Sequence, residues 1–138
     1  MSDHIRHNLA GLSLLVIDDN EAILWSLSAV LSSCGAEVMT ATGNEYDLIY
    51  DHPFNAILLD FQMPGIDGWD VIKAIRSHPS PKIRNLLVIA VTAKASKEDE
   101  QKIMQAGCDF YIRKPVNFPD LLSYLEKVAF QKRQGDST

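Results

Sequence analysis

Short apolar runs alternate with stretches of helical periodicity along almost the whole chain, and this alternation limits the possible folds more than any other feature. The apolar runs have the length and composition of buried strands, and they occupy residues 12–17, 37–41, 56–59, 86–91 and 109–112. The stretches with helical spacing are 21–34, 44–51, 67–77, 96–106 and 117–131. This order predicts an α/β fold, with a five-stranded parallel sheet, helices on both faces and right-handed crossovers.

The apolar positions of the helical stretches indicate which side chains pack against the sheet. In the stretch 67–77 we expect Trp69, Ile72 and Ile75 to point inward, and the segment 78–81 to end the helix. The first stretch has an apolar stripe of Ile23, Leu27, Val30, Leu31 and Cys34. The last has an apolar stripe of Leu121, Leu122, Leu125, Val128 and Ala129.

Polar side chains follow four of the five apolar runs, at the point where each run ends. Asp18 and Asp19 follow the first run, Asp60 the third, Thr92 the fourth and Lys114 the fifth. The carboxyl ends of parallel strands meet at one rim of the sheet, which is where ligands of open α/β sheets bind. A carboxylate at the end of a buried strand must lie where that strand emerges, so Asp60 is the principal candidate. We therefore expect these five side chains to converge on one site.

The expected site combines three carboxylates with one lysine and one hydroxyl. Clustered carboxylates repel one another unless a cation joins them, and oxygen ligands with few protein contacts suit Mg²⁺. Lys114 is a mobile positive charge suited to a phosphoryl oxygen, and Thr92 can donate a hydrogen bond to another. An acid among these groups is suited to accept a phosphoryl group as a nucleophile. The residues thus favour phosphoryl acceptance by Asp60.

In these residues the chain resembles the response-regulator receiver domains of two-component signalling, across residues 12–131. The family's acidic pair matches Asp18-Asp19, its phosphoacceptor Asp60, its switch hydroxyl Thr92, its switch aromatic Tyr111 and its lysine and proline Lys114-Pro115. The loop after the acceptor matches Met63-Pro64, Gly65 and Asp67-Gly68. The combination of motifs is specific, although each part alone is weak.

The resemblance implies a flavodoxin-like doubly wound sheet with strand order 2-1-3-4-5, five helices and a cis peptide at Lys114-Pro115. It implies that Mg²⁺ is held by Asp18, Asp19, Asp60 and the backbone carbonyl of Gln62. Gln62 and Lys94 occupy two positions that tune the lifetime of the phosphate in this family.

The resemblance also implies partners and a signalling route. The phosphoryl group would come from a sensor histidine kinase or a histidine phosphotransfer protein. Thr92 and Tyr111 would pass the change to a downstream protein target through the fourth helix, fifth strand and fifth helix. The chain would catalyse only its own phosphorylation and dephosphorylation, so it would not be an enzyme in the ordinary sense.

Composition narrows the remaining function classes. A net charge of -5 argues against bulk binding of nucleic acid, which needs a basic face. No apolar run approaches the roughly 18 residues of a membrane span, so no membrane partner is expected. Cys34 and Cys108 lack the spacing of a metal site and suit a reducing cytoplasm. We expect one receiver domain at 12–131, with a polar leader at 1–11 and a C-terminal tail at 132–138. His4 and His7 of the leader could chelate a metal, but we interpret them as residues of a terminal tail.

Competing active-site classes lack a required residue. A dehalogenase-type phosphatase needs a second aspartate where Gln62 stands, and the glycine-rich loops of P-loop and dinucleotide-binding proteins are absent. A DNA-binding regulator needs an output module after residue 131, and the given sequence has only residues 132–138 there. A stand-alone receiver, a receiver segment of a larger hybrid histidine kinase or regulator, and a phosphorylation-independent interaction module stay open. The last of these would not bind Mg²⁺.

Two further features lie outside the shared motif. Trp25 points roughly 200° from Ile23 around the first helix, so it faces away from the core. It is either an incidental exposed aromatic or an anchor for a docking partner. The helix that begins at Ser96 is very polar and lies beside Tyr111, which makes it a candidate for the part that moves.

Overall fold

Five parallel strands form the central sheet of the protein, in the order β2-β1-β3-β6-β7. The computed structural model describes residues 7–43, 47–63, 66–93 and 96–135. Along the chain the elements are β1 (Ser13–Ile17), α1 (Glu21–Ser33), β2 (Glu37–Ala41), α2 (Leu48–Asp51), β3 (Ala56–Asp60), β4 (Gln62–Met63), β5 (Ile66–Asp67), α3 (Gly68–Arg76), α4 (Pro81–Arg84), β6 (Leu87–Thr92), α5 (Lys97–Gln105), β7 (Phe110–Arg113) and α6 (Phe118–Gly135).

The sheet confirms the predicted fold class. When its five strands are numbered in chain order, the spatial order is 2-1-3-4-5. The central strand β3 is buried at every position, because helices cover both of its faces. The short antiparallel ribbon of β4 and β5, in which Gln62 pairs with Asp67, was not predicted. It follows β3 directly and forms part of the rim where Asp60 emerges.

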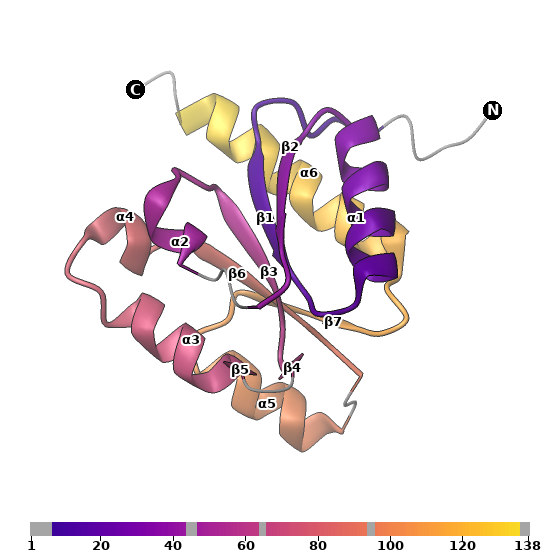
Figure 1. Cartoon of the computed structure of the whole chain (residues 1–138). Helices are drawn as coiled ribbons and strands as arrows, with labels where there is room; N and C mark the ends of the chain where they lie inside the picture. Colours follow the sequence, from indigo (N-terminus) through magenta and orange to yellow (C-terminus); the bar gives the residue numbers. More distant parts are fainter. Residues whose placement is uncertain (1–6, 44–46, 64–65, 94–95, 136–138) are drawn as a thin grey trace.

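Helices α1 and α6 cover one face of the sheet, and α2, α3 and α5 cover the other (Figure 1). Alternate residues of each strand supply the two cores, as the pleat of a strand requires. In β1, Leu14 and Val16 pack with α1 and α6. Leu15 and Ile17 pack on the opposite face with α3 residues such as Ile72. The rim at the carboxyl ends of the strands is left open between these two layers.

The helices agree with the sequence prediction in order but differ in detail. A side chain caps each of α1, α3 and α5, from Asn20, Asp67 and Ser96 respectively. The additional helix α4 begins with Pro81 at its first turn, a position where proline's missing N–H costs nothing. Residues 44–46 of the predicted second helix lie outside the described residues, as do His4, Pro64, Gly65 and Lys94. Among the described residues, no helix is both long and apolar enough to cross a bilayer.

Trp69 was predicted to point into the core, and this was wrong. Its side chain is 40% exposed, whereas Val71, Ile72 and Ile75 are buried. Trp69 lies about 100° around the helix from the centre of that buried stripe. Its ring packs edge-on against Phe61 instead, with the ring centroids 5.2 Å apart. In α1, similarly, the fully inward positions include Leu24, while Ile23 and Val30 lie at the edge of the core.

Both ends of the described chain pack onto the domain. Leu9, within the predicted leader, is fully buried, and its N–H donates to the carbonyl of Cys34 at 2.8 Å. His7 lies 3.2 Å from a carboxylate oxygen of Glu126. Helix α6 continues to Gly135, four residues beyond its predicted end at 131. Residues 7–10 are therefore fixed against α1 and α6, as strand and helix contacts commonly fix a terminus.

Candidate functional site

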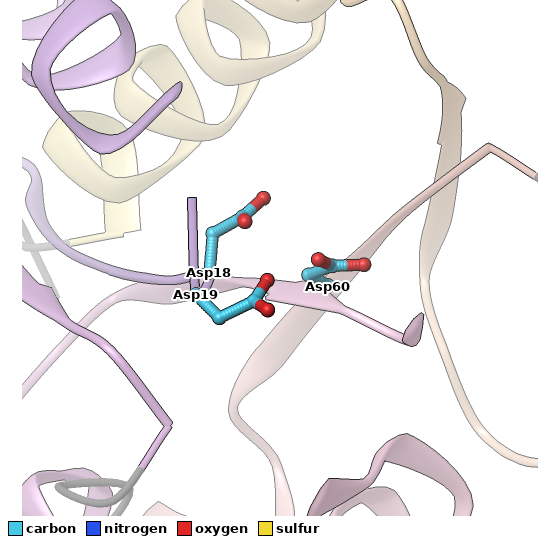
Figure 2. A group of neighbouring side chains, drawn as sticks. All are labelled: Asp18, Asp19 and Asp60. Carbon is cyan, nitrogen blue, oxygen red and sulfur yellow. The ribbon is translucent and has the colours of Figure 1, made fainter. Parts of the chain in front are cut away.

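Three carboxylates meet at the rim of the sheet, as the sequence predicted (Figure 2). Asp60 is the last residue of β3, and Asp18 directly follows β1. Because β1 and β3 are paired up to Ile17 and Leu59, the next residue of each strand emerges at the same place. One carboxylate oxygen from each of Asp18, Asp19 and Asp60 lies within 4.8 Å of the others. Asp18 and Asp60 are only 2% exposed, whereas Asp19 faces solvent.

Lys114 is the cation that these acids share in the structure. Its Nζ lies 3.0 Å from Oδ2 of Asp18 and 3.1 Å from Oδ2 of Asp60. The Lys114 N–H donates to the carbonyl of Thr92 at 2.8 Å, which fixes its backbone beside the end of β6. The peptide bond to Pro115 is cis, as the family resemblance implied. Burial lowers the pKa of Lys114, but the hydrogen bonds that its ammonium donates to Asp18 and Asp60, together with the negative charges of these acids, outweigh burial and raise that pKa overall. The lysine is therefore charged.

Backbone donors hold the other oxygen of each buried acid. The N–H of Asn20 donates to Oδ1 of Asp18, and the N–H of Gln62 donates to Oδ1 of Asp60, both at 2.9 Å. Each buried carboxylate is thus held on one side by a peptide and on the other by Lys114. Buried charges need such compensation, and the contacts also fix the direction in which the two acids point.

The set of donor atoms fits a magnesium ion. Three carboxylates and one lysine leave an excess of negative charge at the rim, and all the candidate ligands are oxygens. Asp19 is exposed, so one side of the cluster is open to water, and Mg²⁺ normally keeps several water ligands. Asp18, Asp19 and Asp60 are the side chains that could hold it, and the family resemblance implies the backbone carbonyl of Gln62 as a further ligand.

Thr92 and Tyr111 lie on neighbouring strands beside this cluster. Thr92 ends β6 and is 1% exposed, and it pairs with Arg113 of β7. Tyr111 is half-buried on β7, and burial raises the pKa of its hydroxyl. Arg113 opposes this change, while Glu100 and Asp99 of α5 add to it. The pKa of Tyr111 therefore responds both to Arg113 on its own strand and to the acidic first turn of α5.

The structure also brings together contacts that the sequence reasoning missed. The side-chain Oε1 of Gln62 accepts a hydrogen bond from the N–H of Ala93 at 2.9 Å. Phe61 covers Gly68 so closely that an added Cβ at Gly68 would lie 2.7 Å from the Phe61 ring. Neither contact carries a local sequence pattern, because each joins residues whose proximity depends on the folded rim.

Trp25 does not belong to the acidic cluster. It is 75% exposed on α1, which confirms that it faces away from the core. On the same helix, Ile23 lines a groove of about 330 Å³ between the start of α1 and the segment after β7. Lys114, Pro115 and Phe118 also line this groove. The groove therefore includes the lysine that contacts Asp18 and Asp60, whereas Trp25 does not line it.

Comparisons with known proteins agree with this site. The model of the response regulator receiver domain family matches residues 14–126. The polar-differentiation response regulator DivK from Brucella ovis is 34% identical over 116 residues, covering 83% of this chain and 93% of DivK. A CheY-like response regulator receiver domain protein from Methanospirillum hungatei is 35% identical, with a TM-score of 0.75, covering 89% of this chain and 98% of that one.

A second solved structure bears on the metal. The receiver domain of a sensor histidine kinase from Pseudomonas aeruginosa is described with a magnesium ion coordinated in its active site cleft. It is 28% identical to this chain, with a TM-score of 0.73, and the match covers 87% of this chain and 98% of that one. The residues that the family model matches include Asp18, Asp60 and Thr92. The chain therefore belongs to the response regulator receiver domains of two-component signalling.

Proposed function

We propose that this receiver takes a phosphoryl group onto Asp60 from a phosphohistidine donor, either a sensor histidine kinase or a histidine phosphotransfer protein. Response regulator receiver domains interact with histidine kinases and with downstream targets. The observation that supports Asp60 is its setting, as a buried carboxylate between a lysine, a backbone N–H and two further acids. We propose that the reaction takes place in the cytoplasm.

The residues around Asp60 divide the chemical work. One oxygen of Asp60 attacks phosphorus, and the bond from phosphorus to the imidazole nitrogen of the donor breaks as the new P–O bond forms. The Lys114 ammonium already contacts the Asp60 carboxylate. After the transfer it can form an ion pair with a phosphoryl oxygen instead. Asp18, Asp19 and the carbonyl of Gln62 would hold Mg²⁺ with Asp60, and the ion supplies charge neutralisation. The chain catalyses only its own phosphorylation and dephosphorylation.

The proposed output is a change at Thr92 and Tyr111. A phosphoryl group adds charge and acceptor oxygens, and the Thr92 hydroxyl can turn to donate to one of them. The half-buried Tyr111 can then move toward the space that the threonine vacates. Helix α5, which lies beside Tyr111, buries only Ile103 among its residues, so little packing opposes its movement. The result is a population shift between two packings of α5, β7 and α6.

The acceptor assignment is tested by intact-mass measurement after incubation with acetyl phosphate and Mg²⁺. We expect one added phosphoryl group, and we expect none without Mg²⁺. Asp60→Asn should abolish the addition, whereas Asp51→Asn, which changes an exposed aspartate on α2, should leave it intact. Equal uptake of hydroxylamine-labile phosphate by Asp60→Asn would contradict the assignment. A phosphorylation-independent interaction module would take up no phosphate in any form.

The donor protein is proposed to dock over α1, which carries the exposed Trp25 and begins directly after the acidic pair, and over the groove that Lys114 lines. Trp25→Ala should slow phosphotransfer from the histidine donor and leave phosphorylation by acetyl phosphate unchanged, since the small donor does not use that surface. Phe130→Ala is the matched control, because Phe130 is also an exposed aromatic but lies on the later part of α6. Equal slowing with both donors would show that Trp25 supports the fold instead.

One solved relative is the receiver domain of a sensor histidine kinase, and others are response regulators. The receiver chemistry proposed for Asp60 is the same in both settings. A receiver segment of a larger hybrid kinase would pass its phosphoryl group to a second histidine protein. A response regulator would act on its target directly, and phosphotransfer assays with purified partners distinguish the two.

A further inference from the structure

The last turns of α6 and the segment 7–10 form a surface that lies mostly outside the family match. The family model covers residues 14–126, whereas α6 continues beyond them. Leu9 is fully buried in the core beneath α1 and α6, which fixes the segment 7–10 in place. The guanidinium of Arg133 donates to the carbonyl of Ala10 at 2.9 Å. The two segments therefore form one packed unit.

A groove of about 410 Å³ is formed jointly by these two segments. Lys127, Phe130 and Arg133 line it at intervals of three residues, so they follow one another on one face of α6. Phe130 lies between the two cations, and its side chain is 56% exposed. The other lining residues are Asn8, Glu126 and Gln131. The groove thus offers one aromatic ring with a positive charge on either side.

The two cations of the groove can meet the charge of a partner. Within the described part of the chain, no carboxylate is close enough to Lys127 or Arg133 for an ion pair. The backbone contact of Arg133 is with a neutral carbonyl, which orients the guanidinium without cancelling its charge. Glu126 is the one acid in the lining, and the N-terminal segment holds both of its oxygens. Its Oε1 lies 3.2 Å from Nδ1 of His7, and its Oε2 accepts the N–H of Asn8 at 2.9 Å.

The groove lies at the opposite end of the sheet from the acidic cluster. The segment 7–10 comes before β1 and Asp18 comes directly after it, so the length of this strand separates them. The five residues of β1 span about 16 Å. Figure 1 shows the end of α6 on the side of the sheet opposite β4 and β5. The histidine donor must reach Asp60, so it has no need of this groove.

We propose that this groove docks a protein partner that presents an acidic segment, in which two carboxylates flank an apolar side chain. Lys127 and Arg133 are about 9 Å apart along the helix at 1.5 Å per residue, so the two carboxylates should have a similar spacing. The apolar side chain would cover Phe130, since aromatic residues and arginine are enriched at protein interfaces. This docking goes beyond the function proposed for Asp60 and does not depend on its phosphorylation.

Charge favours this occupant over two alternatives. A two-fold contact between two copies of the chain, centred on Phe130, would bring the cations of one copy against those of the other. An anionic membrane surface is normally bound by a cluster of about four or more cations, and the groove presents two. An acidic segment with one apolar anchor matches both the number and the sign of the charges.

The test follows amide NMR shifts of the full chain during titration with a synthetic helical peptide. The peptide carries glutamate three residues before and three residues after a single leucine. We expect saturable shifts at Lys127, Phe130 and Arg133, of equal size with and without beryllofluoride, a mimic of the phosphoryl group. A matched peptide with lysine in place of both glutamates should cause none. Added salt should weaken the binding, because exposed charges are screened.

Variants of the groove separate docking from non-specific attraction. Phe130→Ala should weaken peptide binding about tenfold, as the loss of an interface anchor does. Lys127→Glu should also weaken it, because it places a like charge against the peptide. Lys73→Glu is the matched control, since Lys73 is an exposed lysine on α3, and it should leave binding unchanged.

Four results would overturn the proposal. The first is the absence of saturable shifts at the groove, and the second is equal binding by Phe130→Ala and the unaltered chain. The third is binding that requires beryllofluoride, which would assign the groove to the phosphorylation-dependent surface. The last is self-association of the chain, or binding to vesicles of phosphatidylserine and phosphatidylcholine, in place of peptide binding.

Discussion

Arg76, at the end of α3, joins this helix to two other segments of the chain. Its Nε donates to the carbonyl of Gly107 at 2.9 Å, and its Nη1 donates to the carbonyls of Leu86 at 2.6 Å and Arg84 at 2.8 Å. Its Nη2 lies 2.8 Å from Oδ2 of Asp109. The guanidinium therefore holds the segment before β6 and the turn between α5 and β7 against the end of α3.

We predict that Arg76→Met lowers the free energy of unfolding by about 2–4 kcal/mol. A buried hydrogen bond to a charged group contributes roughly 1.5–3 kcal/mol, which would give a larger sum for these contacts. The Arg76 side chain is 24% exposed and that of Asp109 is 35% exposed, so solvent screens the ion pair and can rehydrate part of the freed carbonyls. The discounted loss corresponds to a fall of about 10 °C in the melting temperature of a domain of this size.

Thermal unfolding followed by circular dichroism measures this effect. Arg84→Met is the matched control, since the Arg84 side chain is exposed and reaches its carbonyl acceptors at 3.2 and 3.3 Å. Its loss should cost less than about 1 kcal/mol. Arg76→Lys should fall between the unaltered chain and Arg76→Met, because an ammonium cannot reach all the acceptors of a planar guanidinium. Equal melting temperatures for Arg76→Met and Arg84→Met would refute the reasoning.

Three further predictions concern the rim and the buried thiol. Asp19→Asn should remove most of the Mg²⁺-dependent rise in melting temperature without destabilising the metal-free chain, because it relieves like-charge repulsion; an unchanged rise would exclude Asp19 as a ligand. The pKa of the Cys108 thiol is raised from 9.0 to about 12, mainly by burial. The charge of Arg76 opposes this rise, and the charge of Asp109 adds to it. The folded chain therefore retains this proton more strongly, so its stability should be lost progressively above pH 9 in denaturant titrations, and Cys108→Ala should flatten that dependence. Gly68→Ala should destabilise the fold by about 1–3 kcal/mol and change Trp69 fluorescence, since the new Cβ would meet the Phe61 ring.

The sequence was sufficient to predict the sheet and the acidic cluster because both follow from strand ends. A charge directly after a buried run can lie only where the strand emerges, and parallel strands emerge together. Asp18, Asp60 and Lys114 accordingly meet within hydrogen-bonding distance. The strand order itself came from the family resemblance, since the alternation of elements does not determine which strands are neighbours.

The features that the sequence did not predict depend on long-range contacts. Trp69 has helical spacing from Ile72, but the Phe61 ring offers it a partner at the rim, and only the fold places that ring. The carbonyls that Arg76 binds belong to backbone that any residue could supply, so no side-chain pattern indicates them. The Gln62 contact with Ala93 likewise depends on the pairing of β3 with β6.

These contacts divide the surface around Tyr111 into a fixed part and a lightly held part. Arg76 binds the carbonyl of Gly107, directly after α5, and Asp109 also accepts the N–H of Val88 in β6 at 2.9 Å. The end of α5 is therefore tied to the sheet. The rest of α5 buries only Ile103 and begins with three acidic residues in its first turn. A movement of Tyr111 would then tilt α5 about its fixed end, because displacing the whole helix would require breaking the Arg76 contacts as well.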